Sequence, residues 1–206
     1  MNVIENLYKE LRDEYGQPKG QWSLWCKRPK TETEREEIIL GAILTQRTNW
    51  KNVELALKNL KNRKKSKISH LKYIYRLGAK KLAPLIKPSG FYKTKADYLF
   101  NLANFFIKNY GSLIDMKKAD LKNLRLELLD LNGIGEETAD SILLYGLEKP
   151  IFVIDEYTRR LVKKRKLAKK FSYPFLQNLF EKNLKPDYRL YQDFHALIVI
   201  DGKNRI

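Results

Sequence analysis

The residue of this chain best suited to chemistry is Asp155, a carboxylate that stands where an apolar run meets a basic helix. The run is Ile151–Ile154, and the residues after Asp155 are predicted to form a helix over 156–167. A carboxylate fixed beside a reacting centre stabilises developing positive charge, and it also orients a water or takes its proton. The alternative role is the N-terminal cap of the helix, which an aspartate here also fits. The two roles are alternatives that one residue can combine.

A second candidate lies just upstream, in a turn made of two glycines with one apolar residue between them. Gly133, Ile134 and Gly135 separate two predicted helices, over 118–130 and 136–146. Without side chains on the glycines, the backbone can approach a phosphate, and the start of the second helix favours an anion. Ile134 is expected to be buried and to lock the turn. A plain turn between helices is the alternative, and its carbonyls also suit a monovalent cation.

The overall charge favours a polyanionic partner. The chain has 206 residues, with 41 Lys and Arg against 24 Asp and Glu, which gives a formal net charge of +17. So large an excess repels itself in a folded protein unless it faces a polyanion such as a nucleic acid. A Lys-rich but merely solvated surface is the alternative. Since 43% of the residues are hydrophobic, we expect a buried core rather than a disordered chain.

Several kinds of site are disfavoured because the chain has few sulfur and imidazole ligands. Cys26 is the only cysteine, so neither an intramolecular disulfide nor a four-cysteine zinc or iron–sulfur site can form within this chain. His70 and His195 are the only histidines, and we expect no metal site and no cofactor. The sequence shows neither a secretory signal nor an apolar run of membrane-spanning length. A cytoplasmic protein, nucleoid-associated in a prokaryote, is therefore expected.

Helical periodicity runs through most of the chain and predicts an all-α fold of about ten short helices. An amphipathic pattern covers 3–15, and Thr33 with Glu36 forms a capping box for the next helix. Ile151–Ile154 is an isolated β-like run. The basic segment Lys61–Lys67 suits a solvated loop and a frayed helix end equally. Further helices are expected over 50–60, 71–77, 79–86, 92–109, 118–130, 136–146, 156–167, 172–183 and 188–201.

These segments together resemble the HhH-GPD superfamily of DNA glycosylases, named for a helix-hairpin-helix, a Gly/Pro-rich loop and an aspartate. Leu131–Ala139 is similar to the family hairpin, and Asp155 falls where the family has its catalytic aspartate. The hairpin together with Asp155 is the specific part of the resemblance. The likeness extends over roughly residues 35 to 203, which is nearly all of the chain.

Three further stretches agree with this family. Ile39–Thr48 resembles the segment that carries a glutamine inserted into the duplex, here Gln46. Ile86–Ala96 resembles the loop whose apolar tip, here Phe91, wedges between bases. A solvent-facing helix end and ordinary packing against the next helix are the alternatives for these two residues. Tyr191–Lys203 resembles the last helix of the family core.

The resemblance implies a two-lobed helical protein with a cleft between its lobes. A central lobe like a six-helix barrel is expected over 34–118, and it carries Gln46 and Phe91. The second lobe is expected to combine 1–33 with 119–206 and to carry the hairpin and the aspartate. The implied partner is double-stranded DNA that contains a damaged or mismatched base. We expect a monomer and no membrane association.

Two departures from the family concern its second activity and its cofactor. Members that also cleave the strand as lyases carry a lysine two residues after the second glycine, where this chain has Glu137. A carboxylate cannot form a Schiff base with the sugar, so only Lys93 or Lys95 is left for weak cutting of abasic sites. Many relatives end in a four-cysteine iron–sulfur loop, and this chain stops at Ile206, about where that loop would begin. The chain therefore looks most like the cluster-free branch of 3-methyladenine DNA glycosylase III.

Extruding a nucleotide from the duplex requires compensating contacts, which we expect from aromatic and basic side chains. Trp22 and Trp25, with Tyr8 nearby, are candidates for stacking on the flipped base, and packing within the N-terminal segment is the alternative. A cationic alkylated purine stacks well on electron-rich rings. Tyr145 is expected to pack inside the hairpin, and His195 to be a structural hydrogen-bonding residue. The expected DNA contacts are Gly133, Ile134, Gly135, Glu136, Thr138, Gln46, Phe91, Lys93, Arg160 and Lys203.

The resemblance therefore implies a monofunctional DNA glycosylase of base-excision repair. Such an enzyme hydrolyses the N-glycosidic bond of a flipped base, and Asp155 would stabilise the oxocarbenium-like sugar. An alkylated purine is the favoured substrate, and uracil or thymine opposite guanine is the near rival. A non-catalytic protein that uses the hairpin to bind abasic or bent DNA, and a bifunctional glycosylase and lyase, remain as alternatives.

Overall fold

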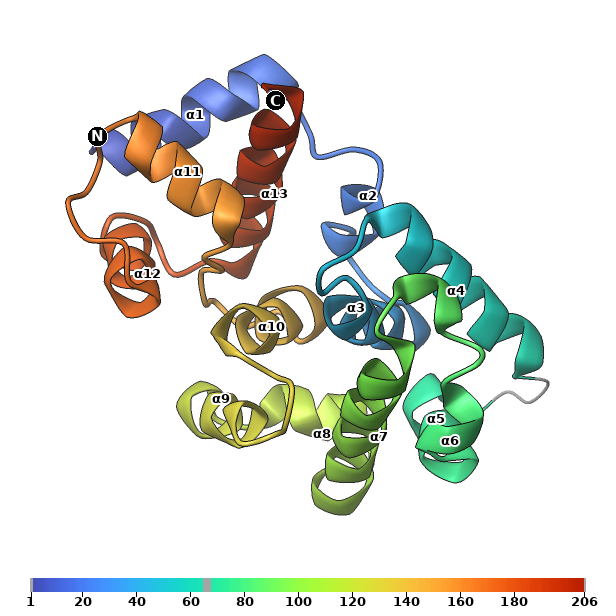
Figure 1. The fold of residues 1–206 in the computed structure, drawn as a ribbon. Coiled ribbons are helices and arrows are strands. Elements are labelled where there is room, and N and C mark those ends of the chain that lie inside the picture. Colours follow the sequence, from blue (N-terminus) through green and yellow to red (C-terminus); the bar gives the residue numbers. More distant parts are fainter. Residues whose placement is uncertain (1, 65–67, 206) are drawn as a thin grey trace. The chain divides into compact units, whose positions relative to one another are not determined.

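The structure, a computed structural model, describes residues 2–64 and 68–205, and every regular element within them is helical (Figure 1). Thirteen α-helices in this part of the chain confirm the all-α prediction. Two short ones were not predicted, α2 (Trp22–Trp25) and α8 (Leu113–Lys118). The β-like run Ile151–Ile154 is buried but is neither strand nor helix. Each helix in the described ranges is too short or too polar to span a lipid bilayer.

The chain divides into two compact units, of which unit 1 consists of Met1–Arg28 and Leu143–Ile206. Its core is the C-terminal helix, on which the first helix and the helix after Asp155 both pack (Figure 1). Phe194 and Leu197 of the C-terminal helix are completely buried. The helices of unit 1 are α1 (Val3–Tyr15), α2, α11 (Glu156–Lys164), α12 (Tyr173–Lys182) and α13 (Tyr188–Asn204).

Unit 2 consists of Pro29–Ile142 and is organised around its first helix, α3. This helix contacts α4, α5, α7 and α10, and its second half is buried. Of the basic segment Lys61–Lys67, the residues up to Arg63 end α4, and residues 65–67 lie outside the described residues. The elements of unit 2 are α3 (Glu32–Leu44), α4 (Trp50–Arg63), α5 (His70–Leu77), α6 (Ala79–Leu82), a 3-10 helix (Lys87–Ser89), α7 (Tyr92–Asn109), α8, α9 (Leu121–Leu129) and α10 (Glu136–Ser141).

Helix α3 begins two residues earlier than the sequence predicted, because Thr31 and not Thr33 is its cap. The Glu34 N–H donates to Thr31 Oγ1 at 3.3 Å, and the Thr31 N–H donates to the Glu34 carboxylate at 2.8 Å. The sequence offers two overlapping capping boxes, and use of the first leaves Glu36 inside the helix. There its carboxylate accepts the N–H of His70 at 2.6 Å and so holds the start of α5.

The boundary between the units differs from the predicted division. The predicted lobe was 34–118, whereas unit 2 extends over Pro29–Ile142, so that the hairpin shares a unit with Gln46 and not with Asp155. The reason is local packing, because α10 contacts both α3 and α9. A π-helix, Ile142–Gly146, continues α10 and contains the boundary.

Candidate active site

Asp155 caps the N-terminus of α11, as the sequence predicted. Its Oδ1 accepts two hydrogen bonds from Thr158, one from the backbone N–H at 2.7 Å and one from the hydroxyl at 2.8 Å. Its Oδ2 accepts no hydrogen bond from the described residues and lies 3.6 Å from Nε2 of His195. The side chain remains 13% exposed. One carboxylate oxygen is therefore fixed, while the other is available to a bound molecule.

The segment that precedes this carboxylate is held by side chains of α12. The Phe152 N–H donates to the Glu181 carboxylate at 2.8 Å, and Gln177 Nε2 donates to the Phe152 carbonyl at 2.8 Å. The Tyr173 hydroxyl accepts the Ile154 N–H at 3.3 Å. Buried backbone groups outside regular structure need such partners. These three bonds let the apolar run stay buried without a second strand, and they fix where α11 begins.

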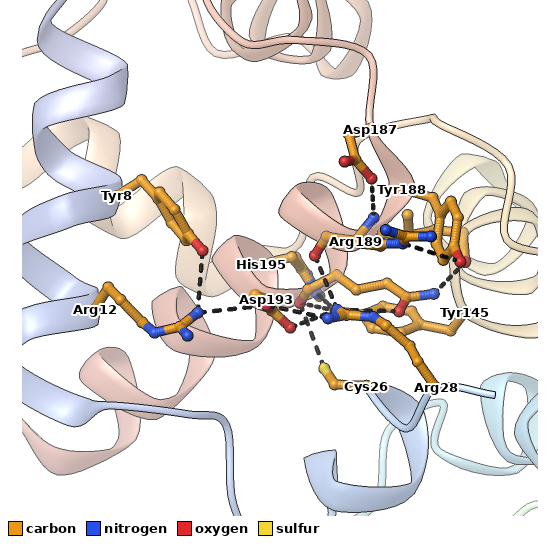
Figure 2. A network of polar contacts seen from close by, with 12 residues as sticks. Tyr8, Arg12, Cys26, Arg28, Tyr145, Asp187, Tyr188, Arg189, Asp193 and His195 are labelled. Atoms are coloured by element: carbon orange, nitrogen blue, oxygen red, sulfur yellow. Dashed lines mark hydrogen bonds and ion pairs between the residues drawn. The ribbon is translucent and has the colours of Figure 1, made fainter. Parts of the chain in front are cut away.

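The charge of Asp155 is maintained against the effect of burial. Burial alone raises the pKa of the carboxyl, but the electrostatic effect of His195 and the two hydrogen bonds just described outweigh it, so that the pKa lies below its ordinary value. Asp193, a neighbouring acid on α13, is neutralised separately. Arg28 lies 2.6 Å from one of its oxygens and Arg12 lies 3.4 Å from the other (Figure 2).

Trp22 and Trp25 belong to a buried aromatic cluster that borders the aspartate through His195. The centroid of Trp22 lies 5.7 Å from that of His195 and 5.6 Å from that of Tyr145. Trp25 lies 5.0 Å from Tyr145, and the two indoles are 6% and 5% exposed. The prediction that Tyr145 packs inside the hairpin is wrong, because its ring joins this cluster in unit 1.

The other candidate residues of unit 1 make separate contacts. Tyr8 packs on Phe194 with ring centroids 5.3 Å apart, and its hydroxyl accepts a hydrogen bond from Arg12 at 3.2 Å (Figure 2). These contacts join α1 to α13. Arg160 and Lys203 are exposed, and their charged groups contact other side chains at 2.9 Å and 3.3 Å.

In unit 2 the hairpin uses its two glycines differently. Gly133 has φ +86°, and a Cβ there would stand 2.3 Å from the ring of Tyr98. Ile134 is 4% exposed, so its side chain is buried as predicted. Gly135 begins α10 without a side-chain cap, and no atom lies within 4 Å of its ideal Cβ position. The turn is therefore packed at the first glycine and open at the second.

An arginine joins the two helices of the hairpin. Arg125 on α9 donates from Nε and Nη2 to the two oxygens of Asp140 on α10, at 2.7 Å and 3.1 Å. Such a bidentate pair fixes orientation as well as distance. Asp140 is completely buried, and Glu136 lies 3.7 Å from the same guanidinium. Glu137, at the position of the lyase lysine, is exposed on α10.

Gln46 braces the hairpin from the end of α3. Its Nε2 donates to the carbonyl of Gly133 at 2.9 Å and to the hydroxyl of Thr138 at 3.1 Å. The side chain is partly exposed, and it can enter a duplex only by breaking both bonds. The Gly133 carbonyl, one of the turn carbonyls that the sequence suggested for a monovalent cation, accepts this hydrogen bond from Gln46. In the described ranges, no group of three His, Cys, Asp or Glu side chains is placed to hold a metal ion.

Phe91 and two nearby lysines have contrasting environments. Phe91 is 64% exposed in the left-handed region at φ 45°, a strain of about 1–3 kcal/mol for a residue other than glycine. Lys95 is buried, and its Nζ donates to the carbonyls of Leu44 and Ser89, both at 2.7 Å. It ties the end of α3 to the turn before Phe91, and burial lowers its pKa to about 8. Lys93 is exposed.

Comparison with known sequences shows that this chain is similar to DNA repair proteins. Residues 40–186 match the HhH-GPD superfamily base excision DNA repair proteins. A provisionally named DNA repair glycosylase of Methanocaldococcus jannaschii is 44% identical over 200 residues, which cover 96% of this chain and 86% of that protein. Endonuclease III of Sulfolobus acidocaldarius is 26% identical over 206 residues, with coverage of 98% and 87%.

Solved structures that resemble this chain also include DNA repair enzymes. The 3-methyladenine DNA glycosylase of Helicobacter pylori, bound to 1,N6-ethenoadenine, superposes with a TM-score of 0.79 at 31% identity, covering 100% of this chain and 99% of that one. A trapped covalent intermediate of endonuclease III with DNA has a TM-score of 0.73 at 15% identity, covering 99% and 88%. At that identity the second likeness concerns the fold alone.

The two hairpin glycines are expected to respond differently to an added methyl group. Gly133→Ala should destabilise the protein by roughly 2–5 kcal/mol, since alanine is strained at positive φ and its Cβ overlaps the Tyr98 ring. Gly135→Ala, with open space around it, should change stability by less than about 1 kcal/mol. Urea unfolding followed by circular dichroism measures both. Equal stabilities of the two variants would contradict the packing at Gly133.

Stability should also depend on the ionisation of Asp155. Because its folded-state pKa is lowered, the stabilisation is complete above the unfolded pKa of about 4 and is lost as the pH falls through the folded value. Asp155→Asn keeps a capping side chain but has no charge. The wild type should therefore exceed this variant in unfolding free energy at pH 7, and the difference should shrink below about pH 4. A difference that stays constant between pH 7 and pH 3 would argue against this linkage.

Proposed function

The chain belongs to the HhH-GPD superfamily of base excision DNA repair proteins and to its DNA glycosylases, and we propose that it is a monofunctional enzyme that releases alkylated purines from double-stranded DNA. The observation that carries this proposal is the Asp155 carboxylate, with Oδ1 fixed by Thr158 and Oδ2 without a hydrogen bond. Such an oxygen suits the sugar carbon, where positive charge develops as the bond to the base breaks.

The chemistry assigned to Asp155 requires that it be ionised when the base departs. Its lowered pKa keeps the carboxylate charged at neutral pH, so it stabilises the oxocarbenium-like sugar without first losing a proton. The same oxygen is suited to orient the attacking water. Hydrolysis then leaves an abasic site and the free base, with the water supplying the hydroxyl group of the sugar.

The preference for an alkylated purine rests on the aromatic cluster and on one relative. Trp22 stands against His195, the residue beside Asp155, and Trp25 supports Trp22 at a centroid distance of 5.7 Å. The two indoles are 6% and 5% exposed, so a base reaches them only if the cluster opens, and electron-rich indoles then favour a cationic, methylated purine over a neutral base. The H. pylori glycosylase, 31% identical to this chain, was crystallised with a modified adenine.

Binding of the duplex is assigned to backbone and basic groups that read no sequence. The open backbone at Gly135 and the first turn of α10, with Glu136 and Thr138, suit a phosphate that approaches closely. Exposed cations supply further phosphate contacts, and Phe91 supplies an apolar wedge for the opened step. The candidate cations are Lys93, Arg160 and Lys203. Gln46 fills the vacated position only if it leaves its two bonds to the hairpin.

Release of the base should require Asp155. In duplexes that each carry one lesion, the wild type should release 1,N6-ethenoadenine and 3-methyladenine faster than uracil or thymine opposite guanine. Asp155→Asn should slow single-turnover release roughly 10²- to 10⁴-fold while duplex affinity changes little, since asparagine keeps the helix cap. Free base is scored by chromatography, and abasic sites by cleavage with alkali.

The control for this experiment is Arg160→Gln, which removes an exposed charge without touching the aspartate. It should weaken DNA binding slightly and leave the single-turnover rate at saturating enzyme unchanged. Equal rates for the wild type and Asp155→Asn would remove the carboxylate from the mechanism. Binding without release on every lesion would favour a non-catalytic hairpin protein, and preferred release of uracil or thymine would transfer the specificity to mismatches.

A covalent intermediate should not accumulate. Borohydride reduction traps a Schiff base between a lysine and the sugar, but Glu137 occupies the lysine position and Lys95 is buried with its Nζ bonded to two carbonyls. Incubation of the wild type with abasic-site DNA and borohydride should therefore give little adduct on a denaturing gel, with an endonuclease III as positive control. A strong adduct that disappears in Lys93→Gln would assign lyase activity to that exposed lysine.

A further inference from the structure

His195, on α13, presents its two ring nitrogens to two different groups. Nδ1 lies 2.7 Å from the hydroxyl of Tyr145, and Nε2 lies 3.6 Å from Oδ2 of Asp155. The residue is 4% exposed, and Nε2 has no hydrogen-bond partner in the described residues. The edge-on contact with Trp22, at 5.7 Å between centroids, limits rotation of the imidazole. A buried donor without a partner is thus aimed at the one carboxylate oxygen that stays available.

The hydroxyl of Tyr145 decides where the imidazole carries its protons. If this hydroxyl donates to the Gln192 carbonyl, 3.1 Å away, Nδ1 must carry a hydrogen and donate to the tyrosine oxygen. If it donates to Nδ1 instead, the neutral ring carries its hydrogen on Nε2. An Nε2 without hydrogen would direct a lone pair at the Asp155 carboxylate, which is repulsive. Hydrogen on Nε2 is therefore favoured whether the ring is neutral or charged.

We propose that His195 is a positioning residue for Asp155. His195 holds an Nε2–H toward Oδ2 of the aspartate and thereby keeps the carboxylate ionised and oriented for base release. This inference rests on the proposed function of Asp155. The distance of 3.6 Å between His195 Nε2 and Asp155 Oδ2 is longer than a hydrogen bond, so Oδ2 keeps its lone pairs for the sugar. His195 acts through the aspartate, and Tyr145 acts through His195.

The other titratable groups around this pair do not supply the same effect. Burial raises the pKa of Tyr145 well above its ordinary value, so its hydroxyl keeps its proton. Asp193 on α13 is paired with Arg28 and Arg12, as Figure 2 shows. Cys26 directs its Sγ toward the Gln192 carbonyl at 3.7 Å. Among these groups, His195 is the one in direct contact with the Asp155 carboxylate.

The pH dependence of base release tests the proposal. In the wild type, single-turnover release should persist as the pH is lowered from 7 to about 4, because the carboxylate stays ionised. In His195→Leu, only the hydrogen bonds from Thr158 oppose the effect of burial on the Asp155 carboxyl. The acid limb of the pH–rate profile should therefore move upward by about one pH unit. On that limb the rate of base release should fall roughly tenfold further than the rate at pH 8. His195→Gln, which restores an N–H donor, should recover part of this loss.

Two further variants separate positioning from folding. Tyr145→Phe keeps the aromatic packing but loses the hydroxyl, and it should shift the acid limb in the same direction by a smaller amount. His70→Gln makes the same chemical change at a buried histidine of unit 2, where Glu36 is the neighbour, and should leave the limb in place. Circular dichroism and melting temperatures establish that each variant is folded.

A measurement independent of activity uses the presence of only two histidines in the chain. Nitrogen-15 NMR of the imidazoles, assigned with His70→Gln, should show hydrogen on Nε2 of His195 from pH 5 to pH 8. An unprotonated Nε2, or a folded His195→Leu whose acid limb coincides with that of the wild type, would overturn the proposal. Failure of Asp155→Asn to slow release would instead overturn the proposed function itself.

Discussion

In the proposed reaction, the carboxylate that stabilises a positive sugar must remain charged although the protein covers most of it. Burial opposes ionisation of Asp155, and the structure counters it with two hydrogen bonds from Thr158 and with the ring of His195. Much of unit 1 serves this balance. Helix α12 holds the backbone before the aspartate, α11 begins on it, and α13 supplies the histidine, which Tyr145 holds from the other side.

In the proposed function the hairpin meets a different requirement, because a backbone that is to receive a phosphate must be bare and yet rigid. Bare backbone comes from Gly135, and rigidity comes from contacts made elsewhere. Arg125 fixes α9 to α10, the ring of Tyr98 packs on Gly133, and Gln46 holds the carbonyl of the turn. Side chains set the position of the hairpin, and its main chain remains exposed where a phosphate would bind.

Local patterns were sufficient to predict much of this arrangement, including the all-α fold, the cap at Asp155 and the burial of Ile134. The predictions failed where two local solutions compete or where a contact joins distant segments. Of two overlapping capping boxes, the prediction named the one at Thr33, whereas the helix uses the one at Thr31. The Tyr145–His195 bond joins residues 50 positions apart, and the Gln46–Gly133 bond joins residues 87 positions apart. Such pairs follow from helix packing, which periodicity does not specify.

Lys95 illustrates why a perturbed pKa must be read together with geometry. A lysine with a pKa of about 8 has the properties expected of a nucleophile, and such shifts often mark active sites. Its Nζ, however, donates to the carbonyls of Leu44 and Ser89 inside unit 2 and joins two segments that precede Gln46 and Phe91. Forming a Schiff base would break both bonds and leave two carbonyls without this donor. The lowered pKa of Lys95 therefore reflects a structural role. The lowered pKa of Asp155, by contrast, belongs to a carboxylate with one oxygen that accepts no hydrogen bond.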